Sequence, residues 1–382
     1  MKSGTRMAPA VALLVASVSI AACGKSAHQP RARRHATVPV IMTARLDPAR
    51  SGSLFLSLWQ PPHDSKTVLE EFSLSDGRPV RQLASLPEDA SGPHTGPEGT
   101  VWLTMSTGPR ERNNTAGGDP APNSCSGSVV RLDLPTRESK TVLSFPSSQL
   151  VDDVVPNPSG QLLAMLAGTC DRSYFNQHLL VKDLRSGQEW TIGADAAPCH
   201  ALYTPSWSPD GSKLVFAYGP ANSSERLPET PRSGLGKGVC TQNRPGEVAV
   251  VPAERSSQLS SARLIPPPKG CSYQAAVFDR QGIAAVEGCE QGTPRAYAGL
   301  GDYQGDAYLV QLNGRGRTVL RLALRRESNI TRLASDPSAG LVFVSEGQGE
   351  NTRPAFDWVW TFDGHRLRAV GHYNAHVTAE PW

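Results

Sequence analysis

The sequence predicts an all-β protein: a six-bladed β-propeller of four-stranded antiparallel blades that occupies residues 37–382. Three observations predict this fold. Glycine and proline are abundant, with 35 and 32 copies among 382 residues, which suits a chain of many short strands and turns. A strand–turn–strand unit recurs along the chain. No stretch has the apolar periodicity of an amphipathic helix of ordinary length.

The clearest copy of the repeat runs from Tyr203 to Gly211 (YTPSWSPDG) and leads into the apolar strand Leu214 to Tyr218. Weaker copies align on the glycine of the turn. The turn glycines stand at positions 52, 99, 160, 211, 282 and 340, with spacings of 47, 61, 51, 71 and 58 residues. These spacings are centred near the period of a propeller blade. In the turn itself, proline presets φ, aspartate can bond its own backbone and glycine accepts positive φ.

The rest of each unit follows the same order. After each turn strand come a connection, a third apolar strand, a tight turn and a fourth strand. The expected third strands are Ser128–Leu132, His178–Val181, Glu247–Val251, Ala307–Val310 and Trp358–Trp360. The expected hairpin turns are Asp76-Gly77, Ser186-Gly187 and Asp363-Gly364. One four-stranded sheet buries too little apolar surface to be stable, whereas a radial arrangement lets each sheet cover its neighbours.

One segment carries a family resemblance. Ser206 to Gly211, followed by Lys213 to Phe216, resembles the blade motif of TolB-type β-propellers, and the repeat extends over residues 38 to 382. The resemblance implies a propeller fold and a protein partner, engaged by a loop face or by the mouth of the central channel. It specifies function poorly, because many unrelated activities share this fold.

The two ends of the predicted domain contain segments that could close the ring of blades. His376 to Trp382 has the pattern of an opening blade strand that stops before its turn. We expect it to pair with N-terminal strands, which would remove an exposed sheet edge. Val38 to Leu46 has the same pattern, so it is either an extra strand or part of a poorly marked seventh blade. Six blades is the preferred interpretation.

The N-terminus has the features of an export signal. Lys2 and Arg6 precede an apolar run from Met7 to Ala22, which is too short to span a bilayer comfortably. The small residues before Cys23 resemble a bacterial lipobox. This resemblance implies a lipoprotein signal peptide over residues 1–22 and acylation, such as palmitate, on Cys23. Residues 23–36 are expected to form a flexible basic tether, and the protein to be extracytoplasmic and anchored to the cell membrane by lipid.

Charge and composition limit the classes of partner that we expect for this protein. The formal net charge is only +3, and the cations form no long stripe, so nucleic acid is a poor candidate. No second segment is apolar enough to span a membrane. The chain has 30 Arg against 8 Lys, a bias typical of GC-rich genomes such as those of actinobacteria. We expect a monomer that needs no cofactor.

Six cysteines remain after the anchor, an even number that predicts three disulfides in an exported protein. They are Cys125, Cys170, Cys199, Cys240, Cys271 and Cys289. Cys271–Cys289 is the preferred pair, on neighbouring strands of one unit. Cys199–Cys240 and Cys125–Cys170 are the next candidates. The cysteine and histidine spacings predict no metal site.

Several polar residues are expected at the channel mouth, because first strands line the channel of a propeller. Alignment on the turn glycines places there His94, Asp152, Asp153, His200, Tyr203, Tyr273, Gln274, Arg332 and His376. Asp152 and Asp153 should point to opposite sides of their strand, which disfavours joint chelation of one ion. Each of these residues has a purely structural alternative as a solvated or hydrogen-bonded side chain.

The sequence lacks the motifs of common enzyme classes, including the Gly-x-Ser-x-Gly elbow, His-Glu-x-x-His and phosphate-binding glycine loops. We therefore expect no enzyme, but a binding scaffold for a protein partner in the cell envelope. Two alternatives remain. One is a propeller lyase, hydrolase or dehydrogenase with its site at the channel mouth, which a cluster of His94, Asp152, His200 and Arg332 around a metal would favour. The other is a lipoprotein that binds a small ligand.

Overall fold

A computed structural model describes the chain over residues 41–42, 54–60, 67–86, 90–106, 127–146, 149–169, 178–192, 200–203, 205–220, 246–255, 257–289, 306–324, 329–337, 339–347, 357–373 and 376–381. The chain divides into two units, Met1–Ala36 and Thr37–Trp382, and all described residues belong to the second unit. The predicted signal peptide, the lipidation site Cys23 and the tether lie outside the described residues.

The described strands form six antiparallel sheets. The first sheet contains, from the inside outward, β26 (His376–Pro381), β2 (Leu54–Gln60), β3 (Thr67–Ser73), β4 (Pro79–Leu86) and β1 (Ile41–Met42). The second contains β5 (Ala90–Gly96), β6 (Thr100–Ser106), β7 (Gly127–Asp133) and β8 (Glu138–Ser144). The third contains β9 (Gln149–Pro156), β10 (Leu162–Thr169), β11 (His178–Asp183) and β12 (Glu189–Ile192).

The remaining three sheets follow the same plan. The fourth contains β13 (His200–Leu202) and β14 (Ser206–Trp207), both paired with β15 (Lys213–Pro220), then β16 (Glu247–Pro252) and β17 (Arg263–Ile265). The fifth contains β18 (Cys271–Phe278), β19 (Ile283–Cys289), β20 (Asp306–Leu312) and β21 (Thr318–Ala323). The sixth contains β22 (Asn329–Asp336), β23 (Leu341–Gly347), β24 (Asp357–Phe362) and β25 (Leu367–Tyr373).

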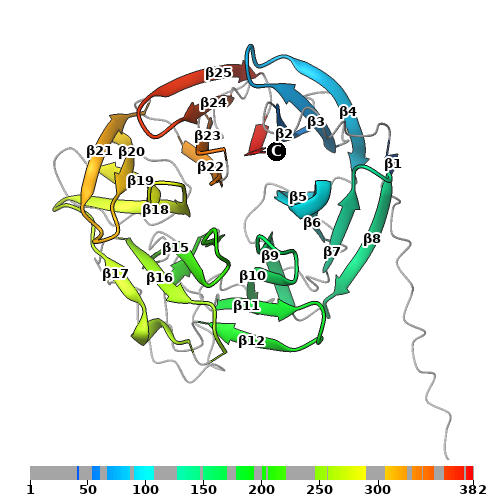
Figure 1. Cartoon of the computed structure of the whole chain (residues 1–382), viewed down its shortest axis with the longest axis horizontal. Coiled ribbons are helices and arrows are strands. Elements are labelled where there is room, and N and C mark those ends of the chain that lie inside the picture. Colours follow the sequence, from blue (N-terminus) through cyan, green and yellow to red (C-terminus); the bar gives the residue numbers. More distant parts are fainter. Residues whose placement is uncertain are drawn as a thin grey trace, which may run out of the picture. The chain divides into compact units, whose positions relative to one another are not determined.

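The sheets stand radially around a central region that is bordered by their inner strands, which we call the channel (Figure 1). Their inner strands touch in ring order, with contacts from β26 to β5, β5 to β9, β9 to β14, β14 to β18, β18 to β22 and β22 back to β26. The third and sixth sheets therefore lie on opposite sides of the channel. The expected all-β propeller of four-stranded antiparallel blades is confirmed.

The ring closes between the two ends of the domain, as the sequence predicts. β26 pairs antiparallel with β2, from Phe55 opposite Pro381 to Gln60 opposite His376. The C-terminal strand thus becomes the inner strand of the first sheet. β1 pairs with β4 on the outer side of that sheet, with Ile41 opposite Ser85. The N-terminal strand is therefore an extra outer strand rather than the start of another blade.

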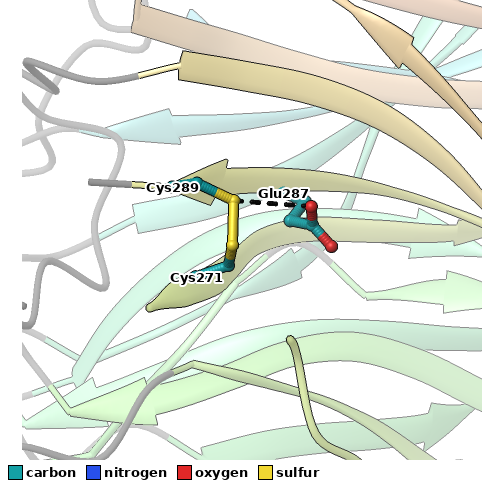
Figure 2. A group of neighbouring side chains, drawn as sticks. All are labelled: Cys271, Glu287 and Cys289. Atoms are coloured by element: carbon teal, nitrogen blue, oxygen red, sulfur yellow. Dashed lines mark hydrogen bonds between the residues drawn. A yellow bond between two sulfur atoms is a disulfide. The ribbon is translucent and has the colours of Figure 1, made fainter. Parts of the chain in front are cut away.

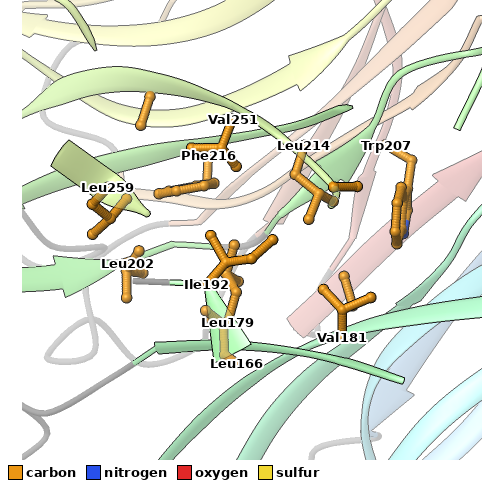
Figure 3. Close-up of a cluster of buried hydrophobic side chains, with 13 residues drawn as sticks. Leu166, Leu179, Val181, Ile192, Leu202, Trp207, Leu214, Phe216, Val251 and Leu259 are labelled. Carbon is orange, nitrogen blue, oxygen red and sulfur yellow. The ribbon is translucent and has the colours of Figure 1, made fainter. Parts of the chain in front are cut away.

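The core consists of six apolar clusters, each between two neighbouring sheets. Figure 3 shows the cluster between the third and fourth sheets, where Leu166 and Leu179 meet Trp207 and Phe216. Neighbouring sheets cover both faces of each sheet, so central strands such as β10 and β15 are apolar along most of their length. Burying a leucine or phenylalanine side chain contributes roughly 1.5–3 kcal/mol, which makes these interfaces the main source of stability.

Strand β10 shows how one segment serves two clusters. Ala164 and Leu166 pack toward the fourth sheet, whereas Leu163 and Met165 pack toward the second. This is the two-residue alternation of a strand, with both faces buried. The run LLAML therefore lacks the apolar–polar alternation of a half-exposed strand, because both faces of this strand are buried.

The repeat motif joins neighbouring sheets at the ends of their inner strands. Nε1 of Trp207 donates to the carbonyl of Val155 at 2.9 Å, which links the fourth sheet to the third. The amide of Phe278 donates to Oγ of Ser206 at 3.2 Å, which links the fifth sheet to the fourth. The conformation of the following turn depends on Gly211, whose φ of +70° favours glycine.

Helix is confined, among the described residues, to the 3-10 turns η2 (Pro97–Gly99) and η3 (Leu259–Ser261). None of the helices in this part of the chain has the length and apolar character needed to cross a membrane.

Asp210, in the turn after β14, leads to a prediction about how the stability of the folded protein depends on pH. Oδ1 of Asp210 accepts hydrogen bonds from Oγ of Ser208 and from the amide and hydroxyl of Ser212. These bonds, led by that from Ser208, lower the pKa of Asp210 to about 2. A lowered pKa stabilises the folded state above the unfolded pKa, and this contribution is lost as the pH falls toward the folded value.

We therefore expect Asp210→Asn to be less stable than the wild type near neutral pH. The difference should shrink between about pH 5 and pH 2, because the wild-type carboxylate becomes protonated there. Urea unfolding at several pH values measures the difference. A gap that stays constant over this range would show that the charge of Asp210 contributes nothing.

Candidate functional site

The inner strands share an irregularity that shapes the channel. The ladder shifts by one residue between Ser91 and His94 in β5, at Asp153 in β9, between Tyr273 and Ala275 in β18 and between Ile330 and Arg332 in β22. In the fourth sheet the inner strand is divided into β13 and β14 at the corresponding place. Such β-bulges redirect side chains, and the bulge in β9 contains Asp153.

Three predicted channel residues meet in one cluster. Nε2 of His94 lies 3.0 Å from Oδ1 of Asp153. Nη1 of Arg332 donates to the same Oδ1 at 2.8 Å. Nη2 of Arg332 lies 2.9 Å from Nδ1 of His94 and also contacts Nε2. We call His94, Asp153 and Arg332 the channel cluster.

The channel cluster crosses the ring. His94 comes from the second sheet, Asp153 from the third and Arg332 from the sixth, on the far side of the channel from Asp153. The side chains of His94, Asp153 and Arg332 are 7%, 13% and 6% exposed. A buried guanidinium needs a counter-charge, and the Asp153 carboxylate supplies it. The ion pair therefore connects sheets on opposite sides of the channel.

Both ring nitrogens of His94 are engaged within the cluster. Nε2 contacts Oδ1 of Asp153 and Nη2 of Arg332, and Nδ1 contacts the same Nη2. A carboxylate only accepts hydrogen bonds and a guanidinium only donates them, so the imidazole lies between an acceptor and a donor.

The backbone supports the same arrangement. Asp153 has φ +44°, in the left-handed region that Asp tolerates better than most residues. Gly92 occupies the corresponding place in β5 with φ +59°. A Cβ added to Gly92 would lie 2.8 Å from Oδ1 of Asp153, so only glycine leaves room for this carboxylate.

Tyr203, Tyr273 and Gln274 are the other predicted channel-mouth residues whose side chains the structure describes. Burial raises the pKa of Tyr203. Burial, aided by the charge of Glu287, raises the pKa of Tyr273 to about 12. Both phenols stay protonated near neutral pH. Gln274 is 3% exposed, and its Nε2 is buried without a hydrogen-bond partner.

For three other predicted residues the structure gives only the backbone position. Asp152 lies in β9 opposite Leu166, His200 in β13 opposite Pro220, and His376 in β26 opposite Gln60. All three are on inner strands, as expected. Their side chains lie outside the described residues.

Asp152 and Asp153 differ from the sequence prediction in one respect. Simple alternation along β9 would place them on opposite sides of a regular strand. The strand is not regular here, because Asp153 is the extra residue of a bulge between Asp152 and Val154. The bulge brings Asp153, rather than Asp152, to His94 and Arg332.

Of the three predicted disulfides, Cys271–Cys289 is confirmed and joins β18 to β19. Cys125, Cys170, Cys199 and Cys240 lie outside the described residues. Cys271, Glu287 and Cys289 come close enough to hold a metal ion. The two sulfurs are bonded to each other, however, and metals bind thiolates, so the oxidised group does not suit a metal.

Sequence reasoning missed two buried ion pairs on the outer parts of sheets. Glu71 is fully buried and pairs with Arg81 at 2.5 Å, and Glu287 is fully buried and pairs with Arg321 at 2.7 Å. The sequence feature that could have revealed these pairs is a carboxylate within an apolar strand, because a buried carboxylate is rare unless it is paired.

No protein-family model matches the chain, and no curated protein matches it. Among solved structures, TolB from Acinetobacter baumannii gives a TM-score of 0.52 at 14% identity, covering 86% of this chain and 65% of that chain. Putative TolB from Agrobacterium tumefaciens gives 0.49 at 14% identity, covering 85% and 91%. Oligogalacturonate lyase in complex with manganese gives 0.45 at 12% identity, covering 80% and 74%.

These similarities concern the fold. The fold of this chain is that of a TolB-type β-propeller. The chain spans just under two thirds of the length of TolB from Acinetobacter baumannii.

The channel cluster generates a stability prediction. Arg332→Met removes the guanidinium that pairs with Asp153 and should lower the free energy of unfolding by about 3 kcal/mol, the low end for a broken buried pair because Asp153 is partly exposed. Asp153→Asn tolerates the same backbone and leaves Arg332 without its counter-charge. The double variant should lose at least about 1 kcal/mol less than the sum of the single losses. Urea unfolding measures all three, and additive losses would contradict the ion pair.

Proposed function

We propose that this protein is a lipid-anchored, extracytoplasmic propeller of six blades that acts as a non-catalytic binding scaffold for a protein partner in the cell envelope. One observation carries the proposal: the chemistry-bearing side chains that meet in the channel bind one another. The cluster connects three sheets across the ring, and its contacts engage His94, Asp153 and Arg332 with one another.

His94 illustrates the point. A general base needs a free lone pair within reach of the proton that it removes. Here Nε2 contacts Asp153 and Arg332, and Nδ1 contacts Nη2 of Arg332. Catalysis at His94 would first require Arg332 to leave, at the cost of exposing a buried charge.

The topology suggests which face meets the partner. The connections between second and third strands all leave from the same end of the blades, as the pairs Ser106 with Gly127 and Gly347 with Asp357 show. The connections from each fourth strand to the next inner strand are at this end too. The two longest connections between these strands, residues 107–126 and 221–246, belong to this set. We call this end the loop end.

Long connections on a rigid scaffold are the usual carriers of recognition. The opposite end carries the short turns within each sheet, and we call it the turn end. The proposal therefore assigns partner binding to the loop end. Anchoring rests on the sequence around Cys23, which would keep the propeller beside the membrane where an envelope protein can reach it.

An enzymatic function is the second candidate, and a specific observation favours it. His94 and Asp153 are in contact as a histidine–carboxylate pair, Arg332 lies beside them, and Asp153 has a strained backbone. Strained residues and such pairs occur at active sites. A substrate that displaced Arg332 would free the imidazole for acid–base chemistry.

The test is site-specific photo-crosslinking in the cells that produce the protein. Lys269 is exposed at the loop end, in the connection between β17 and β18, and Arg185 is exposed at the turn end, between β11 and β12. A photoreactive residue at position 269 should capture one envelope protein reproducibly, and the matched residue at position 185 should not. Cys23→Ala should move the protein from the membrane fraction to the soluble fraction.

The same experiment separates the two candidates. His94→Gln keeps a polar side chain in the cluster, so the capture from position 269 should stay within about twofold of the wild type if the protein is a scaffold. Equal capture from both positions, or none from either, would contradict the assignment to the loop end. Turnover of a small substrate that disappears with His94→Gln would support the enzyme.

A further inference from the structure

The disulfide between Cys271 and Cys289 lies in an unusual chemical environment. Figure 2 shows the two cysteines on neighbouring strands, with Glu287 directed toward the sulfur of Cys289. The Sγ of Cys289 is 3.5 Å from Oε1 of Glu287 and 3.1 Å from Nη2 of Arg321. Both cysteines are half-buried, so a reagent can approach the bond.

The guanidinium is held firmly in place. Nε and Nη2 of Arg321 contact Oε1 of Glu287 at 2.8 and 2.7 Å. Its guanidinium also lies 3.5 Å from the centre of the Tyr308 ring, a cation–π contact. Arg321 is therefore preorganised beside the sulfur and needs no rearrangement to stabilise a negative charge there.

Glu287 disfavours negative charge on the sulfur of Cys289, whereas Arg321 favours it. It is fully buried, and its Oε2 is buried without a hydrogen-bond partner. Its negative charge and the positive charge of Arg321 lie at similar distances from Sγ, so their Coulomb effects largely offset one another. The N–H that Nη2 can donate to a thiolate then favours charge on Cys289. Without Arg321, the carboxylate alone would repel a thiolate at this position.

From this asymmetry we infer that Cys271–Cys289 is a thiol-exchange site at which an external dithiol attacks Cys271 and releases Cys289. The incoming thiolate forms a bond to Sγ of Cys271, and the bond between the two protein sulfurs breaks. Its electron pair leaves on Sγ of Cys289, beside Arg321. The second thiolate of the reagent then attacks the mixed disulfide and releases Cys271. The reagent is oxidised to a disulfide, and the protein gains two electrons and two protons.

Reduction would act at the loop end of the fifth sheet. Cys271 is the first residue of β18 and Cys289 is the last residue of β19, and the two stand opposite each other in the ladder. The disulfide therefore fixes the point where the chain enters the inner strand and the point where the second strand ends. Thiol exchange would release this end of the sheet while the other sheets keep their pairing.

The test traps the mixed disulfide in the folded full-length protein with a monothiol, glutathione, as probe. Trypsin cleavage after Lys269, Arg280 and Arg295 places the two cysteines on separate peptides, which mass spectrometry can quantify. Glutathione should accumulate on Cys271 over Cys289 by roughly threefold to tenfold, because the better-stabilised thiolate leaves. Reduction by dithiothreitol should proceed without denaturant.

Variants test the role of Arg321. Arg321→Gln should slow reduction by about tenfold or more and remove or reverse the preference for Cys271, because Glu287 then acts alone. Arg321→Lys keeps the positive charge and should retain part of the preference if the glutamine variant folds poorly. Arg317→Gln is the matched control, since Arg317 is exposed on the same hairpin and should change neither quantity.

Two results would overturn the inference. One is an equal distribution of glutathione between the cysteines, or a preference for Cys289, in the wild-type protein. The other is a disulfide that resists dithiothreitol until the protein unfolds, which would make it a structural bond only.

Discussion

The pairing of β26 with β2 is the constraint on which the rest of the structure depends. Each sheet hides both of its faces against neighbours, and the six apolar clusters lie between sheets rather than within one. Such a core is complete only when the ring is closed. The C-terminal strand closes it by supplying the inner strand of a sheet whose other strands come from the N-terminal part of the domain. An unpaired β2 would expose a row of backbone donors and acceptors at the channel.

The channel cluster also connects the sheets of the ring, through polar side-chain contacts instead of strand pairing. Arg332 and Asp153 come from sheets on opposite sides of the channel, and His94 joins them from a third sheet. Their meeting depends on the bulges of the inner strands, including the left-handed backbone of Asp153, which costs on the order of 1 kcal/mol. The arrangement persists because the carboxylate satisfies a buried guanidinium, whose isolation would cost more. This balance supports a structural role for the cluster and the proposal of a scaffold.

Features that depend on short-range sequence patterns or on strand order could be predicted from the sequence. The turn at Ser208 to Gly211, the hairpin glycines, the pairing of the C-terminal strand and the Cys271–Cys289 bond follow from nearby residues or from strand order. The meeting of Asp153 with Arg332 could not be predicted, because it depends on a one-residue shift in the pairing of β9 with β10. The pairing of Glu287 with Arg321 was also missed, since the two residues lie on different strands of the fifth sheet and nothing local links them.

The measurement that tests the account most directly is the thermal unfolding of a chain that ends after Tyr373, with and without a synthetic peptide of residues 374–382. The account predicts a fall in melting temperature of more than about 10 °C, because one sheet loses its inner strand and two inter-sheet clusters lose their cover. The added peptide should restore much of the loss by pairing with β2. An unchanged melting temperature in the truncated chain would show that the ring closes elsewhere and would contradict the account.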